Sequence, residues 1–171
     1  MGGRFMSASI RISLAALGKN AWKNDVLSIH PIADDYDLWY ATVECRLAPG
    51  QDEFVNPAGF SIGRAYLAPE DNVPCIISLS DGTKVGYIVF RKWFADDSFS
   101  WSFYLDRDFQ GKGLGKAAAQ LAINILRAAD ASRDIKLSCE AANTKAQRLY
   151  TSVGFTRTDE LDGDDIVYKY R

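Results

Sequence analysis

The segment DRDFQGKGLGKAAAQLAINIL, residues 106–126, places three glycines and two lysines within six residues, directly before a helical run. Glycines let backbone N–H groups approach a ligand, and the N-terminus of a helix adds a partial positive charge. Together these features form a site for an anion. The segment therefore predicts an anion site on Gly111, Gly113 and Gly115, although a glycine-rich turn that only starts a helix remains an alternative.

Two common phosphate-binding motifs do not fit this loop. A Walker loop that ended on Gly115 and Lys116 would need its first glycine at Gln110, and Ala117 stands where that motif has Ser or Thr for magnesium. The glycine spacing is G-x-G-x-G, which also differs from the dinucleotide-binding fingerprint. The sequence therefore predicts neither a nucleoside triphosphatase nor a dinucleotide-binding protein.

Length and composition favour one cytoplasmic domain without a nucleic-acid or membrane partner. A chain of 171 residues can bury one real core, and a second full domain is not expected. The net charge is −2 and no basic stripe occurs, which argues against nucleic acid as a partner. No stretch approaches the roughly 20 apolar residues of a membrane span, and the N-terminal segment lacks the pattern of a signal peptide.

Cysteine and histidine do not form a recognisable metal or catalytic pattern. Cys45, Cys75 and Cys139 are widely spaced, so we expect buried free thiols in a reducing compartment. His30 is the single histidine, and no nucleophile elbow accompanies it. We therefore expect neither a metal site nor a hydrolase triad.

The first half of the chain reads as mostly helical. Alternating apolar residues predict a strand over residues 9–17. Residues 20–47 are expected to form two helices broken near Pro31, followed by a loop over 49–59 and a short helix over 60–67.

The second half carries strand and hairpin signals. We expect strands over 74–80, 84–93, 98–106 and 134–140, helices over 113–130 and 143–154, and a closing hairpin of 155–161 with 164–170. Asn143 suits the N-cap of the second helix, and Gly154 suits its left-handed C-terminal position. This order predicts an α+β fold with one β-α-β crossover in a mixed sheet.

Two segments carry a family resemblance. QGKGLG, residues 110–115, resembles the Q/R-x-x-G-x-G/A signature of the GNAT superfamily of acetyl-CoA-dependent N-acetyltransferases. NTKAQRLYTSVGF, residues 143–155, resembles the N-x-x-A-x-x-x-Y-x-x-x-G-F segment of that superfamily. Within it, GTKVGYIVF, YLDRDFQGKGLGKAAAQLAI, AQRLYTSVGFTRTDEL and APGQDEFVNPAGFSIGRAY are similar to bacterial diamine and spermine/spermidine acetyltransferases, whereas residues 30–47 depart from them.

The resemblance implies a single-domain GNAT fold that uses acetyl-CoA and no metal. Residues 1–70 would form the acceptor side, and residues 71–171 the acetyl-CoA side, where the strands 98–106 and 134–140 splay around the arm of the cofactor. The implied cofactor contacts are Phe103, Tyr104, Leu105, Gln110, Gly111, Lys112, Gly113, Leu114, Gly115, Lys116, Asn143 and Tyr150. A homodimer is also implied.

The implied chemistry is acetyl transfer to a primary amine by direct attack in a ternary complex. Tyr150 would protonate the departing thiolate, although a core tyrosine is the alternative. Roughly one part in a thousand of an alkyl amine is neutral at pH 7. A carboxylate that acts through water would therefore take the proton of the amine. Glu140 is the candidate base, with Glu44 and Asp106 also open, and Asn143 is either a helix cap or a cofactor contact.

The resemblance indicates a small polyamine acceptor, such as spermine or spermidine. An antibiotic amine, a protein amine, a module that binds acyl-CoA without turnover and an assembly protein whose loop binds no cofactor are the alternatives. The acidic run over residues 159–165 is either a solvated hairpin turn or a segment that attracts a polycation. A group of aromatic residues either lines a substrate cavity or packs in the core: Trp39, Tyr40, Trp93, Phe94 and Trp101.

Overall fold

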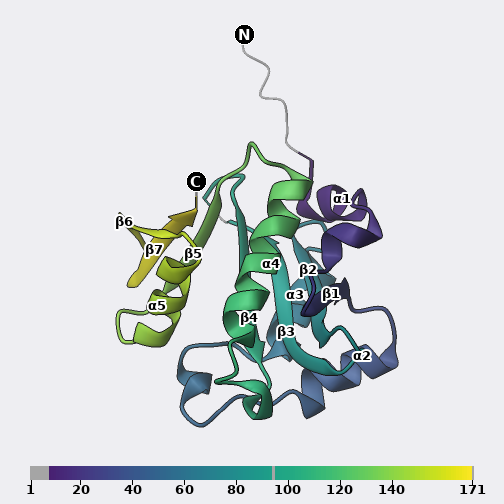
Figure 1. The fold of residues 1–171 in the computed structure, drawn as a ribbon. Coiled ribbons are helices and arrows are strands. Elements are labelled where there is room, and N and C mark those ends of the chain that lie inside the picture. The colour runs from purple at the N-terminus through teal and green to yellow at the C-terminus, as the bar shows by residue number, and fades with distance from the viewer. Residues whose placement is uncertain (1–7, 94, 171) are drawn as a thin grey trace.

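A seven-stranded mixed sheet organises the computed structural model, which describes residues 8–93 and 95–170 (Figure 1). The strand order is β1-β2-β3-β4-β5-β7-β6, and the pairing of β4 with β5 is parallel while the others are antiparallel. The strands are β1 Leu27–Pro31, β2 Asn72–Leu79, β3 Lys84–Lys92, β4 Phe99–Leu105, β5 Ile135–Cys139, β6 Thr156–Asp162 and β7 Asp165–Tyr170. The predicted α+β class, the hairpins and the crossover are confirmed.

Helices cover both faces of this sheet. The helices are α1 Ile10–Ala15, α2 Asp35–Trp39, α3 Ala58–Leu67, α4 Leu114–Ala129 and α5 Thr144–Ser152. Shorter turns are η1 Lys19–Trp22, η2 Tyr40–Glu44 (a π-helical turn), η3 Gln51–Glu53 and η4 Arg107–Phe109. The main core packs α1, α4 and α5 on one face, and a second core packs η2 and α3 on the other.

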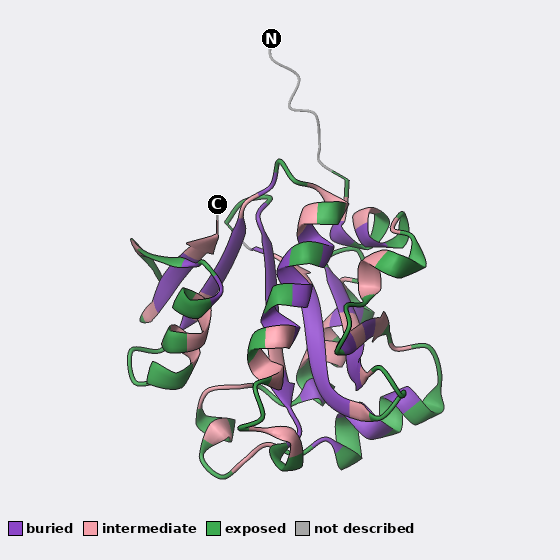
Figure 2. Cartoon of the chain, in the orientation of Figure 1, coloured by how far each residue is buried: buried purple, intermediate pink, exposed green. Residues whose placement is uncertain are grey.

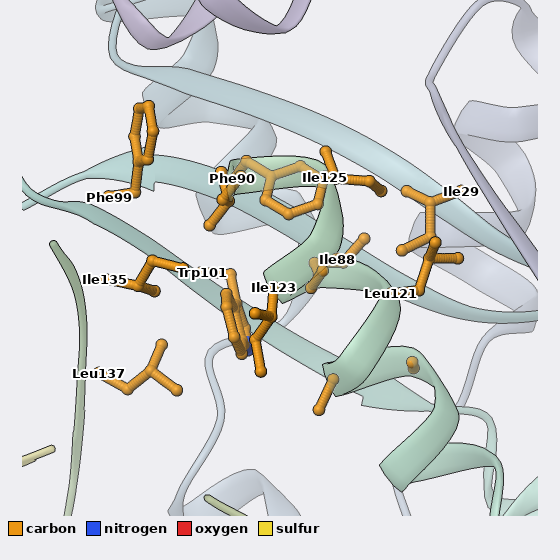
Figure 3. Close-up of a cluster of buried hydrophobic side chains, with 14 of the residues drawn as sticks. Ile29, Ile88, Phe90, Phe99, Trp101, Leu121, Ile123, Ile125, Ile135 and Leu137 are labelled. Carbon is orange, nitrogen blue, oxygen red and sulfur yellow. The ribbon is translucent and has the colours of Figure 1, made fainter. Parts of the chain in front are cut away.

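The long helix α4 anchors the main core. Ala118, Leu121 and Ile125 recur at helical spacing and are fully or almost fully buried. Figure 2 shows the buried residues of α4 on its sheet side, and Figure 3 shows Ile125 beside Phe90 and Leu121 beside Ile29. The predicted helix over 113–130 is therefore confirmed to within a residue at each end.

The predicted strand over residues 9–17 is wrong, because this segment forms α1. Ile10 and Leu14 are buried one helical turn apart, while Ile12 is 60% exposed. Ser9 caps the helix by accepting a hydrogen bond from the Ile12 N–H at 3.2 Å. The spacing of the apolar residues fits both a strand period and a helix period. Packing against α4 selects the helix.

The predicted helix before Pro31 is also wrong, because residues 27–31 form the edge strand β1, which pairs with β2. Leu27 and Ile29 are buried in alternation, and Pro31 ends the strand where a missing N–H is tolerated. His30 therefore lies in a strand rather than in a helix break. The second half of the predicted helical region is confirmed as α2 and η2, and residues 60–67 belong to α3.

The cysteines and aromatic residues considered in the sequence analysis lie partly in the core and partly at the surface. All three cysteines are buried and free. Tyr40, Trp93 and Trp101 are buried, Trp39 is 56% exposed, and Phe94 lies outside the described residues. None of the helices in the described ranges has the length and hydrophobicity to cross a membrane. The cytoplasmic location stays a prediction, as does the division of the chain at residue 70.

Candidate active site

The strands β4 and β5 separate soon after they meet. Their one parallel pairing joins Phe99 to Ile135, and Figure 1 shows β5 leaning away from β4 beyond that point. Along residues 100–105, the edge of β4 therefore has no partner from β5 in the described chain. Backbone groups on such an edge can pair with an extended ligand. This edge includes Phe103, Tyr104 and Leu105.

These three residues offer their main chain rather than their side chains. Phe103 packs against the main core and Leu105 is buried in it. The Tyr104 side chain lies in the second core, where its hydroxyl accepts a hydrogen bond from the Ala58 N–H at 3.3 Å. A ligand that runs along this edge would therefore meet backbone N–H and C=O groups.

The glycine loop lies between η4 and α4. Gly111 and Gly113 have φ angles of +75° and +79°, a region that glycine adopts with little strain. A Cβ atom on Gly111, Gly113 or Gly115 would meet nothing within 4 Å, so the space beside the loop is open. Lys116 is exposed, while the Lys112 Nζ donates to the Asp108 carbonyl at 2.9 Å. The loop thus presents open backbone at the start of a sixteen-residue helix.

Asp106 and Gln110 hold this loop in shape. Both carboxylate oxygens of Asp106 accept backbone N–H groups, from Asp108 at 2.9 Å and from Arg46 at 2.8 Å. The Gln110 Nε2 donates to the Leu105 carbonyl at 2.9 Å. Asp106 is therefore a buried structural carboxylate, and Gln110 ties the loop to the end of β4.

Gln110 also forms a reciprocal amide pair with Gln51, which sequence reasoning missed. Each side-chain nitrogen donates to the other oxygen, at 2.7 Å and 3.0 Å. Lys145 of α5 donates to the Gln110 oxygen at 3.3 Å. No local pattern around Gln51 indicates this contact, because its partner is 59 residues away.

Helix α5 carries Asn143 and Tyr150. The Asn143 Oδ1 accepts from the Ala146 N–H at 3.1 Å and so caps the helix. The Tyr150 ring lies 5.9 Å from the ring of Phe155 and 5.7 Å from that of Tyr168. Burial, followed by the neighbouring Cys139, raises the pKa of Tyr150 well above its ordinary value, and the positive charge of Arg91 opposes this shift only in part.

The two remaining candidate bases lie at the surface. Glu140 is exposed directly after β5, and its side chain has no partner within the described ranges. Glu44 is exposed at the end of η2 and lines neither cavity described below. Glu140 therefore lies at the end of one of the splayed strands, and Glu44 lies two residues before Arg46, whose N–H donates to Asp106 at the end of β4.

Two cavities lie on the α3 face of the sheet and share Arg64 and Arg91. The larger, of about 520 Å³, is lined by Arg64, Arg91, Lys92, Trp93, Ala95, Glu160, Leu161, Asp162 and Val167. The smaller, of about 40 Å³, extends past Arg64 and Arg91 to Ser102 and Tyr104 of β4. Neither contains the glycine loop or Tyr150, so they are candidates for the acceptor rather than for the cofactor. Sequence reasoning missed both arginines.

The residues at the splayed strands fit acetyl-CoA. The open glycine loop at a helix start suits its diphosphate, and the unpaired edge of β4 suits its extended amide-bearing arm. Among the residues that the structure describes, no group of three or more His, Cys, Asp or Glu is arranged to hold a metal ion.

Solved structures share this fold at low sequence identity. An aminoglycoside acetyltransferase AAC(6')-Ib in complex with coenzyme A matches with a TM-score of 0.68 at 20% identity, over 84% of this chain and 92% of that chain. An acetyltransferase from Agrobacterium tumefaciens matches with a TM-score of 0.62 at 16% identity, over 87% and 92%. No curated protein matches the sequence at a significant level.

A family model matches well over half of the chain. The model describes the acetyltransferase (GNAT) family, and it aligns with residues 36–155, a range that includes the splayed strands, the glycine loop and Tyr150. The chain therefore belongs to the acetyltransferase (GNAT) family and is an acetyl-CoA-dependent N-acetyltransferase.

Proposed function

We propose that the protein acetylates a primary amine of a small molecule, which attacks the thioester directly in a ternary complex. Acetyl-CoA supplies the acetyl group and a thiolate leaving group. The observation that carries the proposal is the alignment of an open glycine loop, an unpaired edge of β4 and Tyr150 within one family-matched range. In this proposal Gln110, Lys112, Leu114 and Lys116 hold the cofactor together with the three loop glycines and Asn143.

Tyr150 is proposed as the general acid for the departing thiolate. Because burial raises the pKa of this hydroxyl, it keeps its proton at neutral pH. A thiolate accepts a proton readily from a positioned weak acid, since a thiol has a pKa of about 8.5. Contacts with Phe155 and Tyr168 restrict the ring, which favours one orientation of the hydroxyl.

Glu140 is proposed as the group that receives the proton of the amine, through water. Its exposed carboxylate, which has no partner among residues 8–93 and 95–170, follows β5 at the splay. Asp106 is a poorer candidate, because both of its oxygens already accept backbone N–H groups. Glu44 lines neither of the two cavities described above.

A polyamine is the acceptor that the sequence resemblance favours. The acidic β6–β7 hairpin supports it, since Glu160 and Asp162 line the larger cavity. Burial and the nearby charges of Asp162 and Asp164 raise the pKa of Asp165, a sign of concentrated negative charge. An aminoglycoside is a second candidate, because one solved structure of AAC(6')-Ib, with a TM-score of 0.68, contains an aminoglycoside and acetyl-CoA.

Release of the CoA thiol from acetyl-CoA tests these acceptors directly. Spermine, spermidine, putrescine, an aminoglycoside and a lysine peptide would be compared in parallel. Rapid release with polyamines alone supports the polyamine proposal. No release with any amine, despite binding of acetyl-CoA, contradicts the proposed turnover of an amine.

A homodimer is also proposed, from the resemblance alone. Sedimentation over a range of protein concentrations tests it, and a monomer at every concentration contradicts it.

A further inference from the structure

Trp101 of β4 carries a buried hydrogen-bond donor that the described chain does not use. Its side chain is 2% exposed, and its indole nitrogen Nε1 has no hydrogen-bond partner among residues 8–93 and 95–170. It is one of two buried side-chain nitrogen or oxygen atoms in these ranges without such a partner. Buried polar atoms are normally hydrogen-bonded, because a buried donor without a partner has also lost its contact with water. The indole N–H therefore indicates a partner that the chain itself does not supply.

The indole lies where β4 and β5 begin to separate. The one parallel pairing joins Phe99 to Ile135, and Trp101 follows two residues later on the same face of β4 as Phe99. Leu137 follows two residues after Ile135 on β5 and belongs to the same core. Figure 3 shows the Trp101 nitrogen at the end of the ring that is farther from Phe99. The N–H therefore lies on the side of the ring toward the opening between the strands.

Two ring contacts connect Trp101 to Tyr150. The Trp101 ring lies 5.5 Å from the ring of Phe155, which lies 5.9 Å from the ring of Tyr150. Tyr150 is the proposed acid for the thiolate, so the thioester of the cofactor would lie beside its hydroxyl. The glycine loop follows the C-terminal end of β4, and a cofactor arm that starts there runs along β4 toward Trp101. The indole N–H and the reacting end of the cofactor thus belong to the same part of the splay.

We propose that the indole N–H of Trp101 donates a hydrogen bond to the thioester carbonyl oxygen of acetyl-CoA. This inference rests on the part of the proposed function that places the cofactor arm along β4, and it does not depend on which amine is acetylated. When the amine nitrogen bonds to the carbonyl carbon, the carbonyl oxygen gains negative charge. That oxygen loses the charge when the carbon–sulfur bond breaks and the thiolate leaves. A fixed N–H stabilises the charged oxygen more than the neutral one, so Trp101 favours the reaction as well as the binding.

Phe155 contacts the indole in the free protein and has to yield to the cofactor. The two rings meet edge to face, with 87° between their planes. An N–H can lie against an aromatic face, but this contact is weaker than a hydrogen bond to an oxygen atom. A carbonyl oxygen that enters the splay therefore offers the indole a better partner than the Phe155 ring does.

A matched pair of cofactor analogues tests the proposal by binding alone. S-Ethyl-CoA, a thioether, resembles acetyl-CoA in shape but has no carbonyl oxygen. We expect calorimetry to show that the wild type binds acetyl-CoA about 10-fold more tightly than S-ethyl-CoA. Trp101→Phe removes the N–H and keeps an aromatic ring, so its affinities for the two compounds should converge. Equal affinities in the wild type, or a preference that is unchanged in Trp101→Phe, overturn the proposal.

Trp22→Phe is the matched control for the loss of ring size. Trp22 lies in η1, is partly buried against the same core and contacts Phe90. This variant should keep the wild-type preference for acetyl-CoA and a kcat near that of the wild type, whereas Trp101→Phe should lower kcat by about 10- to 100-fold. Equal loss of affinity for both compounds in Trp101→Phe would show that the indole only fills space, and it would contradict the proposal.

The indole proton reports the contact in the wild-type protein, so the test does not depend on the folding of Trp101→Phe. The chain has four tryptophans, and replacing the other three by Phe one at a time assigns the Trp101 N–H signal by elimination. A hydrogen bond to oxygen moves an N–H proton downfield in the NMR spectrum. Acetyl-CoA should therefore shift this signal downfield, and S-ethyl-CoA should not. Binding of acetyl-CoA without this shift contradicts only the role of Trp101, whereas failure of acetyl-CoA to bind contradicts the proposed function as well.

Discussion

The glycine loop and the arginine cavity are built in different ways. The loop and the edge of β4 belong to one contiguous stretch, residues 99–116, that is closed by contacts such as Gln110 to the Leu105 carbonyl. The cavity takes Arg64 from α3, Arg91 from β3 and Glu160 from β6. A contiguous site depends mainly on local backbone geometry, whereas a dispersed site depends on how every contributing element packs.

The largest expected effect is on turnover, from Tyr150→Phe. This change removes the hydroxyl and keeps the ring that contacts Phe155 and Tyr168. We expect kcat to fall by about 100- to 10,000-fold, while the thermal shift with acetyl-CoA is retained. Tyr168→Phe is the control, since its hydroxyl contacts Gln147 at 3.3 Å. A fully active Tyr150→Phe enzyme would refute the acid role.

The pH profile tests the same hydroxyl. Its pKa is raised, and a general acid works only in its protonated form, so activity is retained below the pKa and lost above it. Deprotonation of Tyr150 should therefore cause no loss of kcat up to about pH 10, the ordinary value for tyrosine. A loss near pH 8 that disappears in Tyr150→Phe would contradict the raised pKa.

The next largest effect is on stability, from Asp37→Asn at the start of α2. Buried Asp37 pairs with Lys84 at 2.9 Å and with His30 at 3.3 Å, and it accepts the Ala33 N–H at 3.1 Å. The variant should lower the free energy of unfolding at pH 7 by about 2 kcal/mol, less than for a fully buried pair because Lys84 is partly exposed. Urea unfolding measures this, with Asp35→Asn as an exposed control.

Acid titration of stability checks the cause. Burial alone would raise the pKa of Asp37, but hydrogen bonds from Lys84 and Ala33 outweigh it, so the pKa is lowered. A lowered pKa adds stability above the unfolded value, near 4, and this stability is lost as the pH falls through the folded value. The wild type should lose this component below about pH 4. Identical acid curves for wild type and Asp37→Asn would contradict the assignment.

A smaller effect is expected from Gly113→Ala, with Gly82→Ala as its matched control. Both glycines have positive φ angles, +79° and +90°, and open space for a Cβ atom. Both changes should therefore cost about 1 to 2 kcal/mol of stability. Only Gly113→Ala should raise KM for acetyl-CoA, by about 10-fold, because strain displaces the loop donors. Equal KM values for the two variants would show that the loop does not bind the cofactor.

The smallest effect is expected from Gln51→Ala, which breaks the link between Gln51 and Gln110. Loss of this amide pair should cost about 1 kcal/mol and raise KM for acetyl-CoA by about 5-fold. Gln120→Ala, at an exposed residue of α4, is the control. Combining Gln51→Ala with Gln110→Ala should give less than the sum of the two effects, and full additivity would show that the pair is not coupled.

Local sequence patterns predicted most of the second half of the fold. The helix over 113–130 follows from a glycine start and an apolar stripe, and the β2–β3 and β6–β7 hairpins follow from their turn residues and strand periodicity. The family resemblance at residues 110–115 and 143–155 is likewise contiguous. These features depend on neighbours in the chain, so the amino-acid order alone was enough to predict them.

Only the tertiary structure decided the features that depend on distant partners. The spacing of Ile10 and Leu14 permits a helix or a strand, and burial against α4 and the sheet selects the helix. β1 exists because β2 supplies its hydrogen-bonding partner. The Gln51–Gln110 pair and the shared cavity of Arg64 and Arg91 join residues that are tens of positions apart. Hydrogen bonds and charges act through space, so these contacts follow from packing rather than from sequence spacing.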